Sequence, residues 1–222
     1  MAAAGLPRLI LFAKEPAAGR VKTRLAAGIG PSRAAALYEA FLEDLAVALP
    51  TPEWEAFLAH AELEAGPRLR KLFGPPWLLA PQGGGDLGER MARAVARAFR
   101  EGAEKAVLAG SDAPTLTAGN VSAALAALDG SDLAFAPARD GGFSMAGLRA
   151  QADPSKLFAP VRWSTELTLA DACRSAADLG LRVAFLPEIP DVDVVGDLSL
   201  LREHFGREPG GAPATRSLLA SL

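Results

Sequence analysis

Short apolar runs alternate with longer amphipathic stretches along the chain, which is the pattern of βα units. The clearest run, Arg8–Ala13 (RLILFA), predicts a first buried strand, and Ser32–Leu49 predicts a helix that ends before Pro50. The same pattern predicts further strands at Trp54–His60, Trp77–Ala80, Lys105–Gly110, Asp132–Pro137, Phe143–Leu148 and Leu181–Pro187, and helices at Glu62–Leu72, Leu87–Gly102, Ala118–Leu128, Thr165–Leu179 and Asp197–Phe205.

The second half of the chain changes character. The strands predicted at Asp132–Pro137 and Phe143–Leu148 are joined only by residues 138–142, and a loop that short usually connects antiparallel neighbours. We therefore expect an α/β fold with a mixed, mostly parallel sheet flanked by helices. One domain would cover residues 1–206, and residues 207–222, rich in Gly, Pro and Ala, would form a loosely packed C-terminal tail.

Composition limits the class of protein. With 50% hydrophobic and 22% charged residues, the 222-residue chain is neither disordered nor fibrous in type. It has no run of about 18 apolar residues, and Pro7 and Arg8 interrupt the N-terminal stretch. We therefore expect a cytoplasmic protein without a membrane partner. A net charge of -3 gives no reason to expect nucleic acid as a ligand.

The histidines and the cysteine form no recognisable site. His60 and His204 are far apart in the chain and have no cysteine or second histidine nearby. Cys173, the single cysteine, lies in a predicted amphipathic helix and cannot form an internal disulfide. We predict structural roles for all three residues.

Positive charge is concentrated directly after the first strand. Residues 14–24 carry four cations against Glu15, a local charge of +3 in a chain that is otherwise -6. Ligands of open α/β sheets bind beyond the carboxyl ends of the strands, where a glycine lets the backbone approach a phosphate. This segment is a candidate anion site, with a solvated basic loop as the alternative. The candidate phosphate-binding residues are Lys14, Gly19, Arg20, Lys22, Thr23 and Arg24.

Two familiar phosphate motifs are absent from this segment. A Walker P-loop needs Gly directly before Lys, and Val21 stands there instead. No G-x-G-x-x-G follows the first strand, so a dinucleotide-binding Rossmann site is not supported.

Acidic residues follow two other predicted strands. Asp112, in Gly110–Pro114 (GSDAP), would place its carboxylate in the same cleft, where a divalent cation takes oxygen ligands; the alternative is that Ser111 or Asp112 caps the next helix. Asp191 and Asp193 alternate in an extended segment and can converge on one ion, or one of them can join Asp112. The alternative is a turn before the helix at 197.

Three further segments are weaker candidates. Residues 140–143 (Asp140, Gly141, Gly142, Phe143) form a favoured tight-turn sequence. In Gln82–Met91, Asp86 and Glu89 resemble a capping box, and the preceding glycines, Gly84 among them, let the backbone approach a ligand. In Val161–Thr165, Ser164 is an expected helix cap, and Trp163 belongs to the core or to a lid over a sugar or base.

Taken in order, these segments resemble a known family. The set F-A-K-E-P-x-x-G-R-V-K-T-R-L, Q-x-G-x-D-L-G-E-R-M, G-S-D-A-P-x-L, A-R-D-G-G-F, V-R-W-S-T and P-D-V-D-x-x-x-D-L runs from about Leu9 to Leu201. It is similar to bacterial GT-A-type proteins usually labelled glycosyltransferase, some of them associated with arsenosugar biosynthesis. It is more distantly similar to 2-phospho-L-lactate guanylyltransferase and molybdenum-cofactor nucleotidyltransferases.

The resemblance implies a nucleotide-diphospho-sugar transferase fold that binds a donor nucleotide with Mg²⁺ or Mn²⁺. It implies that Lys14, Gly19, Lys22 and Arg24 hold phosphates and that Asp112 and Asp193 bind the metal. It also implies that residues 140–143 lie near the acceptor, with Trp163 and Ser164 as further acceptor-side candidates. Metal-dependent GT-A glycosyltransferases typically carry a D-x-D motif in the middle of the sequence, whereas this protein has only Asp112 there, an arrangement closer to nucleotidyltransferases.

Three functions follow as hypotheses. The first is metal-dependent glycosyl transfer from a nucleotide sugar to a small-molecule acceptor, with Lys22 and Asp112 as the catalytic candidates. The second is nucleotidyl transfer from a nucleoside triphosphate to a phosphorylated acceptor, with release of pyrophosphate. The third is a nucleotide-binding module without turnover.

Overall fold

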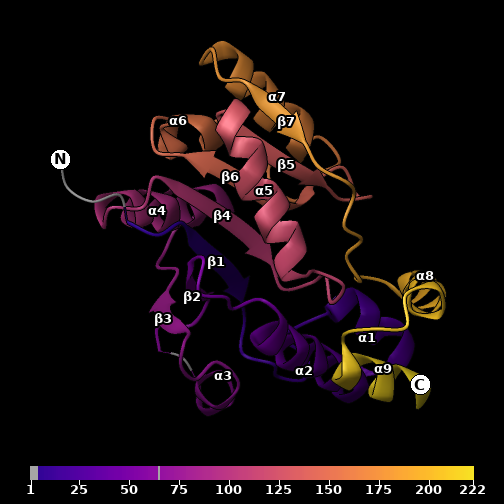
Figure 1. The fold of residues 1–222 in the computed structure, drawn as a ribbon. Coiled ribbons are helices and arrows are strands. Elements are labelled where there is room, and N and C mark those ends of the chain that lie inside the picture. Colours follow the sequence, from indigo (N-terminus) through magenta and orange to yellow (C-terminus); the bar gives the residue numbers. More distant parts are fainter. Residues whose placement is uncertain (1–4, 65) are drawn as a thin grey trace.

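The computed structural model describes residues 5–64 and 66–222 (Figure 1). Its strands are β1 (Arg8–Ala13), β2 (Glu55–His60), β3 (Leu78–Pro81), β4 (Lys105–Gly110), β5 (Leu133–Pro137), β6 (Phe143–Arg149) and β7 (Val183–Phe185). Its helices are α1 (Thr23–Ile29), α2 (Pro31–Ala48), α3 (Pro67–Leu72), α4 (Leu87–Arg100), α5 (Ala118–Gly130), α6 (Pro154–Phe158), α7 (Thr168–Asp178), α8 (Val195–Arg207) and α9 (Pro213–Ala220).

One seven-stranded sheet has the order β3-β2-β1-β4-β6-β5-β7. Every neighbouring pair is parallel except β4–β6 and β5–β6, because β6 returns from β5 through a short loop. The predicted mixed, mostly parallel sheet with a hairpin in the second half is therefore confirmed. The strand register places Phe12 opposite Gly110, so the segments that follow β1 and β4 leave the sheet side by side.

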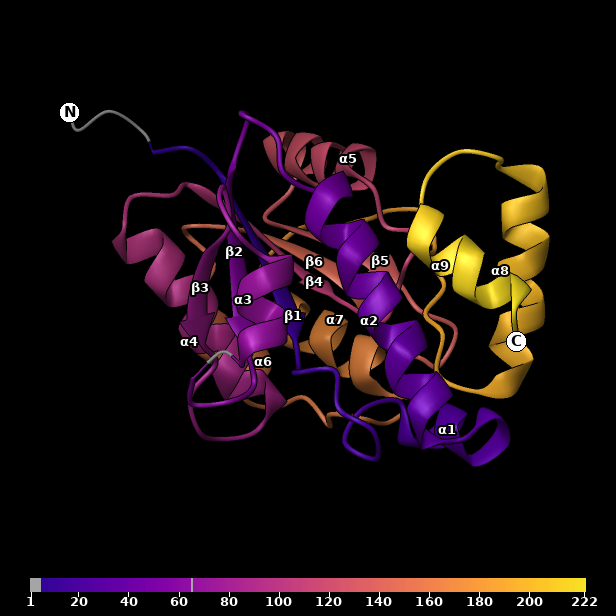
Figure 2. The same cartoon turned by 90° about the horizontal axis from the view of Figure 1, so that it is seen from below.

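Two apolar clusters pack on opposite faces of the sheet. One combines β1 with α2 and α5, and Figure 2 looks onto this face; the other lies under α4, α6 and α7. The near-continuous burial of the β1 residues follows from this double cover, which explains why RLILFA has no polar alternation. No helix in the described part of the protein is both long and apolar enough to cross a membrane.

Several helix boundaries differ from the sequence prediction. The helix expected over Glu62–Leu72 begins only at Pro67, whose fixed φ suits a first helical position, while Ala65 lies outside the described residues. Helix α7 begins at Thr168 rather than Thr165, after the N-cap residue Leu167. The expected cap Ser164 is therefore wrong; its φ of 59° places it in the left-handed region instead.

The C-terminal segment packs more closely than expected. Helix α9 lies against α2, and Leu219 joins the core cluster on that face. The buried carboxylate of Asp44 on α2 accepts hydrogen bonds from the backbone N–H groups of Ala214 (3.0 Å) and Thr215 (2.8 Å). A carboxylate at a helix N-terminus satisfies donors that the helix itself leaves free. Residues 213–220 are thus anchored to α2.

Candidate functional site

A cleft of about 650 Å³ lies at the carboxyl edge of the sheet. It opens where the strand order changes direction, between β1 and β4, which is where open α/β sheets bind their ligands. Most of the candidate residues line it: Lys14, Arg20, Lys22, Thr23, Arg24, Asp86, Asp112, Asp140, Gly142, Phe143, Trp163, Ser164, Asp191 and Asp193. Among the described residues, the candidates Gly19, Gly84 and Gly141 do not line it.

The basic loop between β1 and α1 is held by local backbone contacts. Arg20 N–H donates to the carbonyl of Ala17 (3.0 Å), and Gly19 supplies a φ of 77° in this turn. Lys22 then adopts the left-handed conformation (φ 48°, ψ 43°) at the N-cap of α1. Residues with a side chain, apart from Asn and Asp, seldom take this conformation, and such strain clusters at functional sites.

Two carboxylates and two aromatic rings surround the ammonium of Lys22. Its Nζ forms an ion pair with Asp112 Oδ1 and lies 3.0 Å from Asp193 Oδ1. It also lies 5.9 Å from the centroid of Tyr38 and 5.8 Å from that of Phe41. The lysine side chain is only 3% exposed, whereas Asp112 is 52% and Asp193 35% exposed. The ammonium is therefore buried behind two carboxylates that face the cleft.

A backbone contact explains why the distant acids meet. Val192 N–H donates to the carbonyl of Asp112 (3.0 Å), which attaches the late extended segment to the end of β4. Asp191 and Asp193 flank this contact. Burial, together with the neighbouring carboxylates of Asp193 and then Asp140, raises the pKa of Asp191 to about 6. Asp191 therefore adds a further carboxyl group to the cleft, next to the pair that contacts Lys22.

The capping alternatives for these acids do not hold. Thr117 is the N-cap of α5 and accepts from Asn120 N–H, so neither Ser111 nor Asp112 has that role. Before α8, Asp197 accepts from the backbone N–H groups of Asp193 and Val194, both at 2.8 Å. The carboxylates of Asp112 and Asp193 are thus directed to Lys22 rather than to a helix end.

Within the residues described, no three or more His, Cys, Asp or Glu side chains gather as a ready-made metal site. Asp112 and Asp193 nevertheless suit a hard cation, because both present carboxylate oxygens to one positive charge. Mg²⁺ typically uses one or two protein carboxylates and completes its shell with water and substrate phosphate. The donor chemistry of this pair fits that pattern.

Tyr38 was missed by the sequence analysis. It is the single tyrosine of the protein, on α2, and its buried hydroxyl accepts from Lys14 N–H (3.1 Å) and hydrogen-bonds Ser111 Oγ (2.7 Å). Burial, followed by the nearby Asp112 carboxylate, raises the pKa of Tyr38 above its usual range. The phenol therefore stays neutral and fixes the start of the basic loop beside the segment that carries Asp112.

We expect Tyr38→Phe to lower the free energy of unfolding by about 1–2 kcal/mol, because it leaves the Lys14 amide and the Ser111 hydroxyl without this partner. Urea unfolding of the two proteins measures the difference. Ser111→Ala is the matched control, since it removes only one of the two contacts and should cost less. Equal stability of Tyr38→Phe and the unsubstituted protein would contradict this role.

Gln82, the first residue of the Q-x-G-x-D-L-G-E-R-M segment, was not predicted as a site residue. Its buried amide Nε2 donates to the carbonyls of Ala59 (2.8 Å) and Ala13 (3.4 Å), and the residue lines the cleft. In the following loop, the predicted capping box of Asp86 and Glu89 at the start of α4 is confirmed. Gln82 thus joins the ends of β1 and β2 beneath the loop that leads into α4.

On the far side of the cleft, two loops pack against each other. The hairpin residue Gly141 has a φ of 86°, and a Cβ there would lie 2.1 Å from the backbone oxygen of Glu166. Leu169 N–H donates to the carbonyl of Gly141 (2.9 Å). Only glycine allows both the positive φ and the close approach of the Glu166 backbone. The D-G-G-F turn therefore also packs directly against the loop before α7.

Trp163 connects two of the sequence motifs. Its indole makes edge contacts with Phe143 (6.2 Å between centroids) and Phe158 (5.7 Å). A Cβ at Gly88, in the first turn of α4, would lie 2.4 Å from the indole Nε1. The glycine of D-L-G-E-R-M therefore makes room for the tryptophan of V-R-W-S-T. Trp163 is half-buried, so it both packs on the core and lines the cleft.

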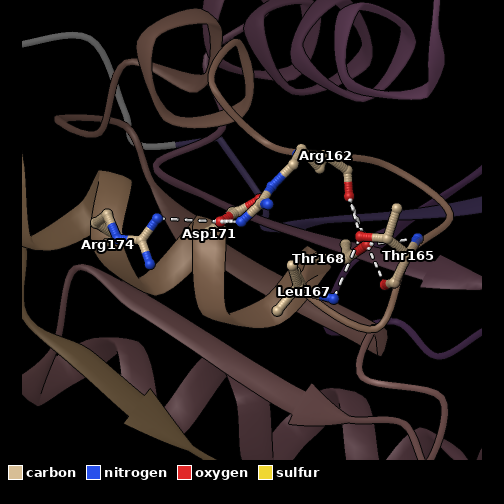
Figure 3. Close-up of polar contacts among 6 residues, drawn as sticks. All are labelled: Arg162, Thr165, Leu167, Thr168, Asp171 and Arg174. Atoms are coloured by element: carbon tan, nitrogen blue, oxygen red, sulfur yellow. Dashed lines mark hydrogen bonds and ion pairs between the residues drawn. The ribbon is translucent and has the colours of Figure 1, made fainter.

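An ion-pair cluster at the start of α7 holds the loop that carries Trp163 (Figure 3). Asp171, with 5% of its side chain exposed, accepts from Arg162 Nε (2.7 Å) and Nη2 (2.8 Å) and from the Arg162 backbone N–H (3.1 Å). Thr165 and Thr168 both donate to the Arg162 carbonyl at 2.9 Å. The hydrogen bonds from Arg162 lower the pKa of Asp171 to about 2.

This shift predicts a specific acid dependence. The pKa of Asp171 is lower in the folded than in the unfolded protein, where it is about 3.9. Its contribution to stability is therefore complete above that value and is lost as the pH falls toward 2. The difference in Tm between the unsubstituted protein and Asp171→Asn should shrink over this range. A difference that stays constant between pH 6 and pH 2 would contradict it.

The histidines and the cysteine lie outside the cleft. His60 is buried and its Nδ1 hydrogen-bonds the carbonyl of Glu62 (2.9 Å). His204 lies on α8 beside Phe205. Cys173 is a half-buried free thiol on α7, and burial raises its pKa. The structural roles of these three residues stay a prediction.

The strand order and the cleft at its switch point define an α/β fold of the nucleotide-diphospho-sugar transferase type. A crystal structure from Desulfovibrio desulfuricans G20, described provisionally as a nucleotide-diphospho-sugar transferase, is 30% identical in sequence, with a TM-score of 0.88 over 98% of both chains. The protein belongs to the family described as "Uncharacterized protein conserved in bacteria (DUF2064)", whose sequence pattern matches residues 45–165.

More distant structures share the fold alone. A 4-diphosphocytidyl-2C-methyl-D-erythritol synthase from Anaerococcus prevotii DSM 20548 has a TM-score of 0.58 at 8% identity, over 91% of this protein and 99% of its own length. A CMP:2-keto-3-deoxy-manno-octonic acid synthetase, solved in complex with CTP, has a TM-score of 0.54 at 12% identity, over 92% and 100%. No curated protein sequence matches this one.

Proposed function

We propose that the protein is a metal-dependent transferase that binds a nucleotide donor in the cleft between β1 and β4. The observation that carries the proposal is the meeting of Lys22 with Asp112 and Asp193, which brings the basic loop and two acids to one point. In phosphoryl and glycosyl transfer, cationic side chains balance the charge on the departing phosphate directly, and paired carboxylates contribute by holding a divalent metal ion that does the same.

Each part of the cleft has a place in this proposal. Lys14, Lys22 and Arg24 would bind the donor phosphates. Asp112 and Asp193 would hold Mg²⁺ or Mn²⁺, which when bound neutralises phosphate charge as the leaving group departs. The hairpin at 140–143 and the loop at 162–165 lie on the other side of the cleft and would recognise a small-molecule acceptor.

Glycosyl transfer is the reaction we favour. The acceptor oxygen would form a bond to the anomeric carbon of the sugar while the bond from that carbon to the nucleoside diphosphate breaks, and the acceptor proton would leave to solvent or a base. Support comes from the description of the Desulfovibrio structure, which matches this protein over nearly its whole length. For glycosyl transfer by this protein, the donor would be a nucleotide-diphospho-sugar.

One observation favours nucleotidyl transfer as the second candidate. Asp112 is the single acid at the end of β4, and its partner Asp193 comes from a late segment, without a D-x-D motif around Asp112. In this reaction an acceptor phosphate would attack the α-phosphorus of a nucleoside triphosphate and pyrophosphate would leave. The fold shared with two nucleotidyl-transferring synthases is compatible with it.

A donor panel separates these reactions. The protein is incubated with Mg²⁺ or Mn²⁺, a cell-extract fraction of small molecules as acceptors, and each of several nucleoside triphosphates and nucleotide sugars. Release of nucleoside diphosphate from a nucleotide sugar supports glycosyl transfer, and acceptor-dependent release of pyrophosphate supports nucleotidyl transfer instead. Tight donor binding with no product from any donor would favour a non-catalytic module and overturn the proposal.

A further inference from the structure

The ammonium of Lys22 lies where its two acidic neighbours would otherwise meet a cation from solution. It contacts carboxylate oxygens of both Asp112 and Asp193, and its side chain is almost fully buried. The rings of Tyr38 and Phe41 lie within 6 Å of Nζ, and such rings stabilise a cation further. Two carboxylates and two aromatic rings thus surround the lysine ammonium.

We propose that Lys22 determines specificity by competing with free divalent cations for Asp112 and Asp193, so that the site accepts a metal–nucleotide complex in preference to the bare metal. This inference rests on the proposed function for the identity of the ligand. The competition itself is a property of the lysine and the two acids.

The preference for the metal–nucleotide complex depends on which anions remain available to the Lys22 ammonium. If a bare cation takes the two acids, the ammonium of Lys22 loses both carboxylates and is repelled out of its buried position by the second positive charge, with no new anion to receive it. If a nucleotide arrives with the cation, Lys22 can exchange the carboxylates for phosphate oxygens at the mouth of the same cleft. Lys22 therefore opposes binding of the bare metal and favours binding of the complex.

Isothermal titration with Mn²⁺ alone tests the competition. We expect Lys22→Met to bind Mn²⁺ at least about tenfold more tightly than the unsubstituted protein, since removing a unit charge in contact with both ligands relieves a direct repulsion. Lys14→Met is the matched control: it removes the same charge from the same cleft, and Lys14 has no ion pair with Asp112 or Asp193 among the described contacts. It should change Mn²⁺ affinity far less.

Equal or weaker Mn²⁺ binding by Lys22→Met, with its fold confirmed by circular dichroism, would overturn the inference. A second measurement needs no variant. Acetylation of Lys22 by an amine-specific reagent, followed by peptide mass spectrometry, should be slow in the free protein and faster when Mn²⁺ is added alone at saturation. The acetylation rate of Lys71, exposed on α3, is the internal reference. Protection of Lys22 that does not change with saturating Mn²⁺ would also overturn it.

These outcomes are separable from the proposed function. Tighter Mn²⁺ binding by Lys22→Met without turnover of any donor would support the competition and overturn the transferase proposal. Turnover by the unsubstituted protein, with unchanged Mn²⁺ affinity in Lys22→Met, would support the transferase proposal and overturn the competition.

Discussion

Replacing Asp112 with asparagine is expected to abolish metal-dependent nucleotide binding and to reduce turnover by about 10²–10³-fold, the scale of a lost metal contact worth several kcal/mol. Asn keeps the shape of the side chain but removes the charge that faces the cleft. The fold should survive, because Asp112 is half-exposed and Lys22 keeps its contact with Asp193. Titration of nucleotide with and without Mg²⁺ measures the effect.

The matched control is Asp178→Asn, which makes the same chemical change at an exposed position at the end of α7, outside the cleft. It should bind nucleotide and metal as the unsubstituted protein does. If Asp112→Asn kept its metal dependence, the role given to Asp112 would be wrong, and a loss of cooperative unfolding would show that the residue is structural.

Replacing Lys22 with alanine is expected to weaken donor binding by about 10–100-fold, the range for a lost hydrogen bond to a charged group. The loss is expected because the donor phosphates lose one cation of the basic loop, while the metal ion held by Asp112 and Asp193 is still supplied at fixed Mg²⁺. Fluorescence or calorimetric titration with the donor, at fixed Mg²⁺, measures the loss.

Lys71→Ala provides the comparison, because Lys71 is an exposed lysine on α3 that does not line the cleft. Its removal should change donor affinity by no more than about twofold, as for a screened surface charge. Equal losses in the two variants would mean that residues 14–24 act only as a solvated basic loop.

The main features of the sheet could be read from the sequence. The apolar run RLILFA coincides with β1, and the short D-G-G connection correctly indicated an antiparallel hairpin. These features are local, since strand burial and turn chemistry are visible in a few adjacent residues. The mixed sheet followed from them.

Elements that depend on distant partners could not be predicted in this way. Helix α1 is short and contains Gly28, which is a poor helix former; a Cβ there would lie 2.1 Å from a methyl of Val195 on α8, so the glycine serves a tertiary contact. Helix α9 depends on the carboxylate of Asp44, which is far away in the sequence. Nothing near residues 213–220 reveals that partner.

The candidate site likewise has residues that could be predicted from local sequence and residues that depend on distant partners. Charge pattern and strand-end position selected Lys22, Asp112, Asp191 and Asp193, and of these acids Asp112 and Asp193 contact Lys22. The pattern carried no sign that Tyr38 would join the loops after β1 and β4, because its partners, Lys14 and Ser111, come together only when α2 packs on the sheet.

A crystal structure with Mn²⁺ and the donor that binds most tightly tests the central claim most directly. The anomalous signal of manganese should lie between the carboxylates of Asp112 and Asp193, with the donor phosphates beside Lys22 and Arg24. Manganese bound away from both acids, or a nucleotide bound outside the cleft between β1 and β4, would contradict the account.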